Sequence, residues 1–160
     1  MPWMSRLLTA ALLASALAAC GGDDAAEPDA GYNCEVEQRD EEFVAGMSKA
    51  GELGIQFTLV SSNPAPPARN DNTWILELHD GGGAPLEGAT VDAKPFMPDH
   101  NHGTSIDVQV TPVDGMPGQY QLSPVNMFMP GVWETTIRAT PAGGSQAERD
   151  SVVFTFCVAS

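Results

Sequence analysis

Beyond residue 50 the chain consists of short stretches in which apolar and polar residues alternate. A period of two places every second side chain on one face, which is typical of β-strands with one buried face. The alternation predicts about seven strands, and an eighth, at the edge of a sheet, is expected near 43–47. The seven lie at 55–59, 74–78, 90–97, 106–110, 120–122, 133–137 and 152–158.

The segments between these strands are rich in glycine, proline, asparagine and aspartate, and no segment after residue 19 shows a helical repeat. Such a chain is typical of an immunoglobulin-like β-sandwich, all-β, with two antiparallel sheets. We expect Trp74, Trp133 and the pair Phe154 and Phe156 to anchor its core. The proline-rich segment 63–72 should interrupt the strands, and the Asp-Gly-Gly-Gly run at 80–83 should form a turn.

The first nineteen residues have a different pattern, with Arg6 followed by an almost wholly apolar run. This run of about 13 residues is shorter than the ~20 that cross a bilayer as a helix. It ends in Leu-Ala-Ala-Cys, which resembles the bacterial lipobox, in which the cysteine is acylated and the chain is cut before it. The sequence therefore predicts a signal peptide over 1–19 and a lipid on Cys20, with a plain secretion signal as the alternative.

The predicted lipid anchor determines the expected location and domain organisation. In many Gram-negative bacteria an aspartate after the lipidated cysteine retains the protein at the inner membrane, and here Gly21 stands at that position. The resemblance favours the outer membrane of the cell envelope, with the lipid as the only contact with the bilayer. Residues 20–33 are small and acidic and predict a flexible tether, and residues 34–160 form the predicted domain.

The net charge excludes two classes of partner. The chain has 21 acidic and 7 basic residues, a formal net charge of −14. Removing residues 1–19 takes away one basic residue, Arg6, and leaves 160 − 19 = 141 residues with a charge of −15. So acidic a protein repels nucleic acid and anionic headgroups, and we exclude both as partners.

The three cysteines also constrain the fold. Once Cys20 carries a lipid, Cys34 and Cys157 remain, in a compartment where disulfides persist. A disulfide between them would join the start of the domain to its last strand. Two buried free thiols or a thiolate metal site are the alternatives.

The candidate chemistry lies in two loops rich in histidine and methionine. The first contains Met97, His100 and His102, and the second contains Met127 and Met129. Imidazole binds copper and zinc, and the soft thioether sulfur selects Cu(I). A His-x-His pair on an extended segment points both rings to the same side, and a sandwich gathers its loops at two ends. These five residues are therefore the candidate ligands of a Cu(I) site. In the alternative, the histidines bind nothing and the methionines fill the end of the core.

An enzyme is not expected. No serine lies in a nucleophile-elbow pattern, and the glycines at 81–83 lack the lysine and helix of a phosphate-binding loop. His79 beside Asp80 is interpreted as the solvent-facing end of a strand rather than half of a catalytic dyad.

Five motifs in a fixed order invite comparison with a known family. They are WILEL at 74–78, GATV at 88–91, MPDHNHG at 97–103, GQY at 118–120 and MPGVW at 129–133. Together they resemble the YtkA-like domain over residues 50–140 and, more distantly, the FixH family of accessory proteins for copper-containing oxidases. The resemblance implies an exported immunoglobulin-like sandwich and, by association, copper handling. FixH-type proteins carry a membrane helix where this chain has a predicted lipid anchor, which argues against a role in oxidase assembly.

Two functions follow from these observations. The first is a lipid-anchored envelope protein that binds or traffics Cu(I) through the methionine and histidine loops, with a copper-handling or other envelope protein as partner. The second is a metal-free structural or protein-interaction module of the envelope.

Overall fold

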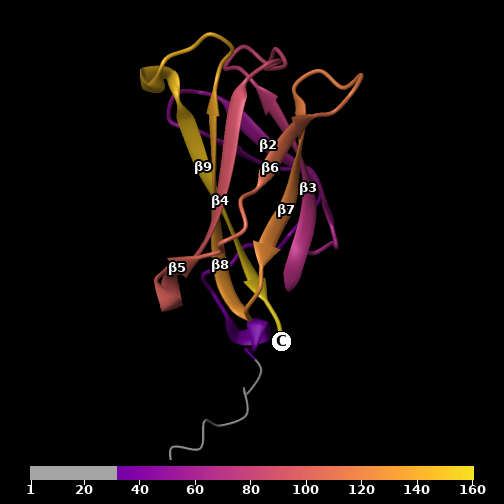
Figure 1. The fold of residues 1–160 in the computed structure, drawn as a ribbon, viewed down its shortest axis with the longest axis vertical. Helices are drawn as coiled ribbons and strands as arrows, with labels where there is room; N and C mark the ends of the chain where they lie inside the picture. Colours follow the sequence, from indigo (N-terminus) through magenta and orange to yellow (C-terminus); the bar gives the residue numbers. More distant parts are fainter. Residues whose placement is uncertain (1–31) are drawn as a thin grey trace, which may run out of the picture.

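The computed structural model describes residues 32–160, so the predicted signal peptide, Cys20 and most of the predicted tether lie outside the described residues. In these residues, nine antiparallel strands form two sheets that pack face to face (Figure 1). The five-stranded sheet has the order β1 (Met47–Ala50), β2 (Gln56–Asn63), β3 (Asn70–His79), β7 (Gln119–Met127), β6 (Gln109–Pro112). The four-stranded sheet has the order β5 (His102–Gly103), β4 (Thr90–Met97), β8 (Gly131–Thr140), β9 (Asp150–Val158).

Helical structure in the described residues is limited to three 3₁₀ turns, which are η1 (Cys34–Val36), η2 (Pro98–His100) and η3 (Gln146–Glu148). Among these residues no helix is long and apolar enough to cross a membrane.

The predicted all-β sandwich is confirmed, and each of the seven expected strands is present. Two further strands are short: β1 begins where the expected edge strand ends, and β5 has two residues. The expected strand at 106–110 begins only at Gln109, and Ile106 is 42% exposed. The Thr104 hydroxyl accepts a hydrogen bond from the Ile106 N–H, and this local turn replaces the strand ladder.

The proline-rich interruption is shorter than expected, since β2 continues to Asn63 and β3 begins at Asn70. The side chain of Asn72 explains this. It accepts a hydrogen bond from the Ala68 N–H and donates one to the Ala68 carbonyl, which closes residues 64–69 into a compact loop.

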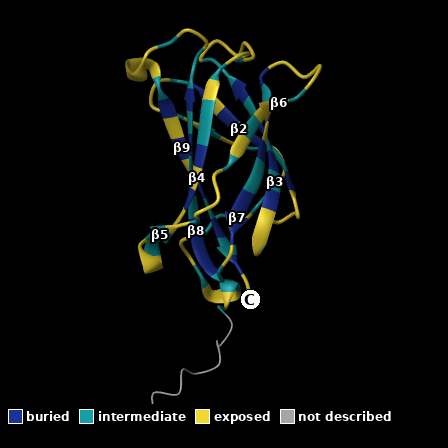
Figure 2. Ribbon diagram, viewed as in Figure 1, coloured by how far each residue is buried: buried dark blue, intermediate teal, exposed yellow. Residues whose placement is uncertain are grey.

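The core lies between the two sheets, and exposed residues gather in the loops at both ends (Figure 2). Trp74, Trp133 and Phe154 are fully buried and Phe156 nearly so, which confirms the expected anchors. The rings of Trp74 and Phe156 meet edge to face with centroids 5.6 Å apart. This arrangement is favourable for aromatic pairs and connects strands of opposite sheets.

The N-terminal segment connects the two sheets before the first strand begins. The Glu41 N–H donates to the carbonyl of Thr155 on β9, and the Glu41 carboxylate accepts from the Thr155 N–H and pairs with Lys49 on β1. The expected disulfide between Cys34 and Cys157 is present, with Cα atoms 5.6 Å apart. It fixes η1 at the end of the sandwich where β9 finishes.

Candidate metal centre

One end of the sandwich carries the candidate chemistry. This histidine end comprises η1, η2, β5, the turn between β7 and β8, and the C-terminal residues (Figure 1). The loops 97–103 and 127–130, expected to converge, both lie here.

A tight turn brings the two histidines together. Pro98 begins η2, and Asn101 ends it in the left-handed conformation, with φ 53°, which asparagine tolerates well. The chain then reverses into β5, so that His102 pairs with Met97. The segment is therefore not extended as expected, yet the His100 and His102 rings still lie 5.6 Å apart between centroids, at 69° to one another.

Aromatic rings hold His102 in place. Its imidazole stacks on Phe128 at 5.6 Å with an interplanar angle of 21°, and meets Trp133 edge on at 6.3 Å. Its Nδ1 lies 3.2 Å from the carbonyl oxygen of Gly103. An Nδ1–H there donates to that oxygen and leaves Nε2 as the metal-binding nitrogen, the usual arrangement for a histidine ligand.

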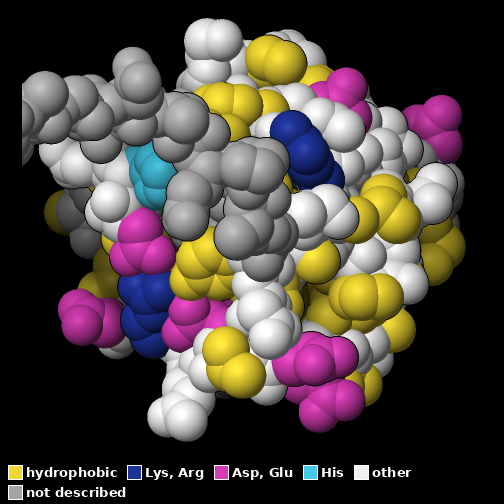
Figure 3. All heavy atoms as spheres, turned by 90° about the horizontal axis from the view of Figure 1, so that it is seen from below, with side chains coloured by type: hydrophobic (Ala, Val, Ile, Leu, Met, Phe, Trp, Pro, Cys, Tyr) yellow, Lys and Arg dark blue, Asp and Glu magenta, His cyan; other side chains and the backbone are white. Residues whose placement is uncertain are grey.

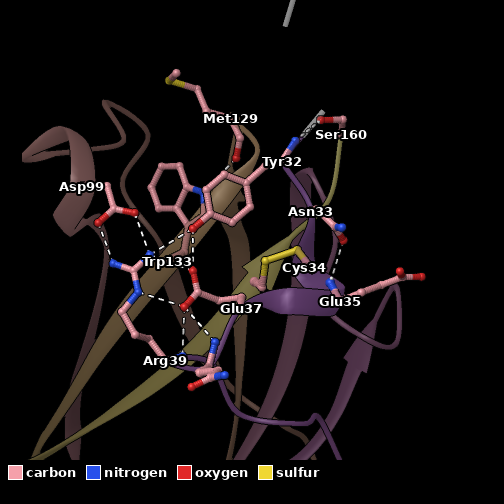
Figure 4. Close-up of a disulfide and its surroundings, with 12 residues drawn as sticks. Tyr32, Asn33, Cys34, Glu35, Glu37, Arg39, Asp99, Met129, Trp133 and Ser160 are labelled. Atoms are coloured by element: carbon pink, nitrogen blue, oxygen red, sulfur yellow. Dashed lines mark hydrogen bonds and ion pairs between the residues drawn. A yellow bond between two sulfur atoms is a disulfide. The ribbon is translucent and has the colours of Figure 1, made fainter. Parts of the chain in front are cut away.

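The three candidate methionines have different environments. Met97 and Met127 are fully buried in the core. The methyl group of Met97 fills the space beside Gly131, where a Cβ would lie 2.2 Å from it. Met129 is only partly buried and lies on the turn between β7 and β8, and its carbonyl accepts a hydrogen bond from Trp133 Nε1 at 2.9 Å. Its side chain extends away from the indole (Figure 4).

The N-terminal strap, which we define as residues 32–39, is bound to the histidine turn (Figure 4). Arg39 donates two hydrogen bonds to the Asp99 carboxylate, at 2.6 and 2.9 Å, and three to Glu37 and Tyr32. These bonds from Arg39 lower the pKa of Glu37 and of Asp99, while the hydrogen bond to Glu37 raises the pKa of Tyr32. Asp99 is thus ionised and committed to Arg39.

The other end of the histidine turn is bound to β7. Thr104 donates to the Asn126 side chain at 3.1 Å, and Asn126 in turn donates to Asp71 at 2.6 Å. The turn is therefore held on both sides. Sequence reasoning missed Arg39, Thr104 and Asn126, because these contacts join residues far apart in the chain and leave no local pattern.

In the part of the chain that the structure describes, the acidic side chains near the histidines do not form a metal site. Seen from below, histidine lies close to acidic and basic side chains (Figure 3). In the described residues no group of three or more histidine, cysteine or acidic side chains is arranged to hold a metal ion. The two cysteines are paired with each other, which rules out the thiolate alternative. Within residues 32–160, a third ligand beside these two histidines would therefore come from another residue type.

The model of the YtkA-like family matches residues 49–138, more than half of the sequence. The chain belongs to the YtkA-like family. The resemblance seen in the five motifs is thereby confirmed. The YtkA-like region contains both histidines and all three candidate methionines, whereas both cysteines of the disulfide and the strap lie outside it.

Two solved structures of FetP from a uropathogenic Escherichia coli strain are similar to the YtkA-like chain. A copper-bound variant has a TM-score of 0.47 and 11% sequence identity, and the match covers 71% of this chain and 89% of FetP. FetP as isolated after recombinant expression in the periplasm of E. coli also has a TM-score of 0.47, with 12% identity and coverage of 75% and 98%. Among curated proteins no match is found.

Proposed function

We propose that this protein is a lipid-anchored protein of the cell envelope that binds or traffics Cu(I) at the histidine end. His100 and His102 supply imidazole ligands and Met129 supplies a thioether. Met97 and Met127, fully buried, pack the core beneath them. The proposed role is binding rather than catalysis, with a copper-handling protein of the envelope as partner and the outer membrane as location.

The observation that carries this proposal is the distance between the two imidazole rings. A bond of about 2.0–2.1 Å from metal to imidazole puts each ring centroid about 3.2 Å from the ion, so two such centroids lie at most about 6.4 Å apart. The observed 5.6 Å lies within this limit. Because the turn is held on both sides, the two rings are already close before a metal arrives.

The neighbouring groups favour a soft ion. The nearest carboxylate in the sequence, Asp99, is committed to Arg39 and offers no oxygen ligand. Hard ions such as Mg²⁺ and Ca²⁺ prefer oxygen, whereas imidazole and thioether suit copper, and thioether suits Cu(I) in particular. Met129 is the thioether available at the surface of this end.

One observation supports the second function, a metal-free module. The stack of His102 on Phe128 and its contact with Trp133 make the ring part of the packing at this end. If packing is its only role, removing it lowers the free energy of unfolding and leaves copper binding unaffected.

Cu(I) titration of the mature protein against a competing chelator separates these functions. Replacing both histidines, His100→Ala and His102→Ala, should abolish Cu(I) binding at neutral pH and lower the metal-free stability by only about 0.5–1.5 kcal/mol, since the His102 ring contacts Phe128 and Trp133. His79→Ala is the matched control, a half-buried histidine on β3, and should bind as wild type. Unchanged affinity in the double variant rules out the site, and a large stability loss with unchanged affinity identifies the packing role.

A further inference from the structure

We propose that the histidine end faces the membrane in the anchored protein, and that copper is exchanged there with a protein embedded in the same membrane. This inference rests on the proposed lipid at Cys20 and names the partner of the proposed copper site. The structure contributes the position at which the chain enters the domain.

The first described residue lies at the histidine end. The Tyr32 N–H donates to the hydroxyl of Ser160 at 3.0 Å, and the Tyr32 ring lies 3.8 Å from the position that a Cβ on Gly131 would occupy. Tyr32 therefore contacts both the C-terminus and the start of β8. The chain coming from Cys20 meets the domain beside the histidine turn.

The strap is attached to the histidine end at two points, so the chain from Cys20 cannot enter the domain at the opposite end. The disulfide joins Cys34 to the end of β9, and Arg39 joins the strap to Asp99, next to His100. One covalent bond and one bidentate ion pair thus attach the strap at two points of the same end. The side of the domain nearest the anchor is fixed by the fold.

The length of chain between Cys20 and Tyr32 limits how far the domain can lie from the membrane. From Cys20 to Tyr32 there are 32 − 20 = 12 residues, which span at most about 40 Å when fully extended. A strand of ten residues such as β8 is about 33 Å long, so the opposite loops lie one strand length further from the anchor. The predicted charge of −15 also disfavours adsorption of the domain on anionic headgroups.

These limits favour a partner in the bilayer. The exposed His100 and the partly exposed Phe128 lie at the end of the domain that this connection of at most about 40 Å joins to the anchor. A protein embedded in the same membrane meets this surface at a high effective concentration, as for two sites joined by a short linker. A large soluble carrier would have to enter the gap between domain and bilayer.

Energy transfer to vesicles tests the orientation without copper. The mature lipoprotein receives a donor dye on an azide-bearing residue at Val36, on η1 and 71% exposed, or at Asp114, in the exposed turn before β7 at the opposite end. With acceptor dye on the lipid headgroups, transfer should be stronger from Val36. Equal or stronger transfer from Asp114 overturns the proposal. A mature protein without a diacylglyceryl adduct also overturns the proposal. If the lipoprotein shows the expected energy transfer but binds no copper, the proposed function is wrong and the orientation still holds.

Copper transfer tests the partner. The Cu(I)-loaded lipoprotein is mixed with bicinchoninate, either linked to a lipid of the same vesicle or free in solution. Inserting 30 Gly and Ser residues between Gly31 and Tyr32 lengthens the connection from 12 to 42 residues. Transfer to the lipid-linked chelator should then fall about sixfold, following the −3/2 power of linker length, while transfer to the free chelator stays constant. Equal transfer at both lengths overturns the membrane partner and identifies a soluble carrier.

Discussion

Two turns of this domain place an aspartate beside a histidine: His79 ends β3 and Asp80 follows it, and Asp99 and His100 follow β4. The Asp80 carboxylate accepts hydrogen bonds from the N–H groups of Gly82 and Ala84, at 2.8 and 2.9 Å, within its own turn. The Asp99 carboxylate is bound instead by Arg39, sixty residues away.

The difference changes what each histidine can do. His79 lies 3.6 Å from the Glu77 carboxylate. His100 instead lies beside the imidazole of His102, and among the described residues neither His100 nor His102 forms an ion pair with a carboxylate. A turn closed by hydrogen bonds between its own residues depends less on the rest of the fold. A turn held by distant residues forms only in the finished fold, which can thereby hold two imidazoles close together.

Removing the disulfide should have the largest effect on this comparison. The double variant Cys34→Ser and Cys157→Ser should lose about 2–5 kcal/mol of unfolding free energy, because the bond closes a long loop. Hydrogen exchange should increase most in the strap and the histidine turn and least in the turn at Asp80. Equal increases in both turns would show that the two do not differ in their dependence on the fold.

Two glycines give the second contrast. Gly83, in the Asp80 turn, has φ +86° and nothing within 4 Å of an added Cβ, so Gly83→Ala should cost about 1–2 kcal/mol from backbone strain alone. Gly131 has φ +133° and its Cβ would meet the methyl of Met97. Gly131→Ala should therefore cost about 2–4 kcal/mol, since crowding adds to strain. Chemical denaturation measures both, and a smaller loss at Gly131 would contradict the packing described here.

Arg39→Ala should change the pKa of Asp99 and leave the pKa of Asp80 unchanged. Hydrogen bonds from Arg39 are the main cause of the lowered pKa of Asp99, whereas backbone N–H groups of its own turn lower the pKa of Asp80. The variant should raise the pKa of Asp99 toward its ordinary value near 4 and leave that of Asp80 unchanged. Carboxyl NMR titrations follow both groups in one sample. A matching shift at Asp80 would show that the turns are coupled.

Mild acid should have the smallest effect. A carboxyl whose folded pKa is lowered contributes stability above its ordinary value near 4 and loses it as the pH falls through the lowered value. Asp80, Asp99 and Glu37 all have lowered pKa values, so their contributions should be equal at pH 7 and pH 5 and decline only below about pH 4. Unfolding midpoints across this range provide the check, and an earlier decline at these groups would contradict the hydrogen bonds that bind them.

Local pattern was sufficient for much of the fold. Alternation located the strands, and the same alternation along β4 places Met97 on the inward face with Ala93 and Pro95. Along β7 the inward positions shift from Tyr120 and Leu122 to Val125 and Met127, where the pairing with β3 is irregular, so the burial of Met127 does not follow from the alternation. The sequence alone therefore predicts the burial of Met97 but not that of Met127. The disulfide was predictable because only two cysteines remained once Cys20 was assigned to the lipid.

The rest of the site depends on distant contacts. Nothing near Arg39 indicates that its partner is Asp99, and nothing near Phe128 indicates that His102 stacks on it. Asn101 adopts the left-handed conformation, and the segment that we expected to be extended therefore forms a turn. The pairing of the imidazoles is therefore a product of tertiary structure, although their residue types pointed to the chemistry.

The hydrogen bonds between Glu41 and Thr155 have a consequence for biosynthesis. They join one of the first described segments to the last strand, so the sandwich cannot close until its C-terminal residues have been made. Contacts between such distant residues are slow to form during folding. We therefore expect this domain to complete its folding only after synthesis, which would suit the export predicted from the first nineteen residues.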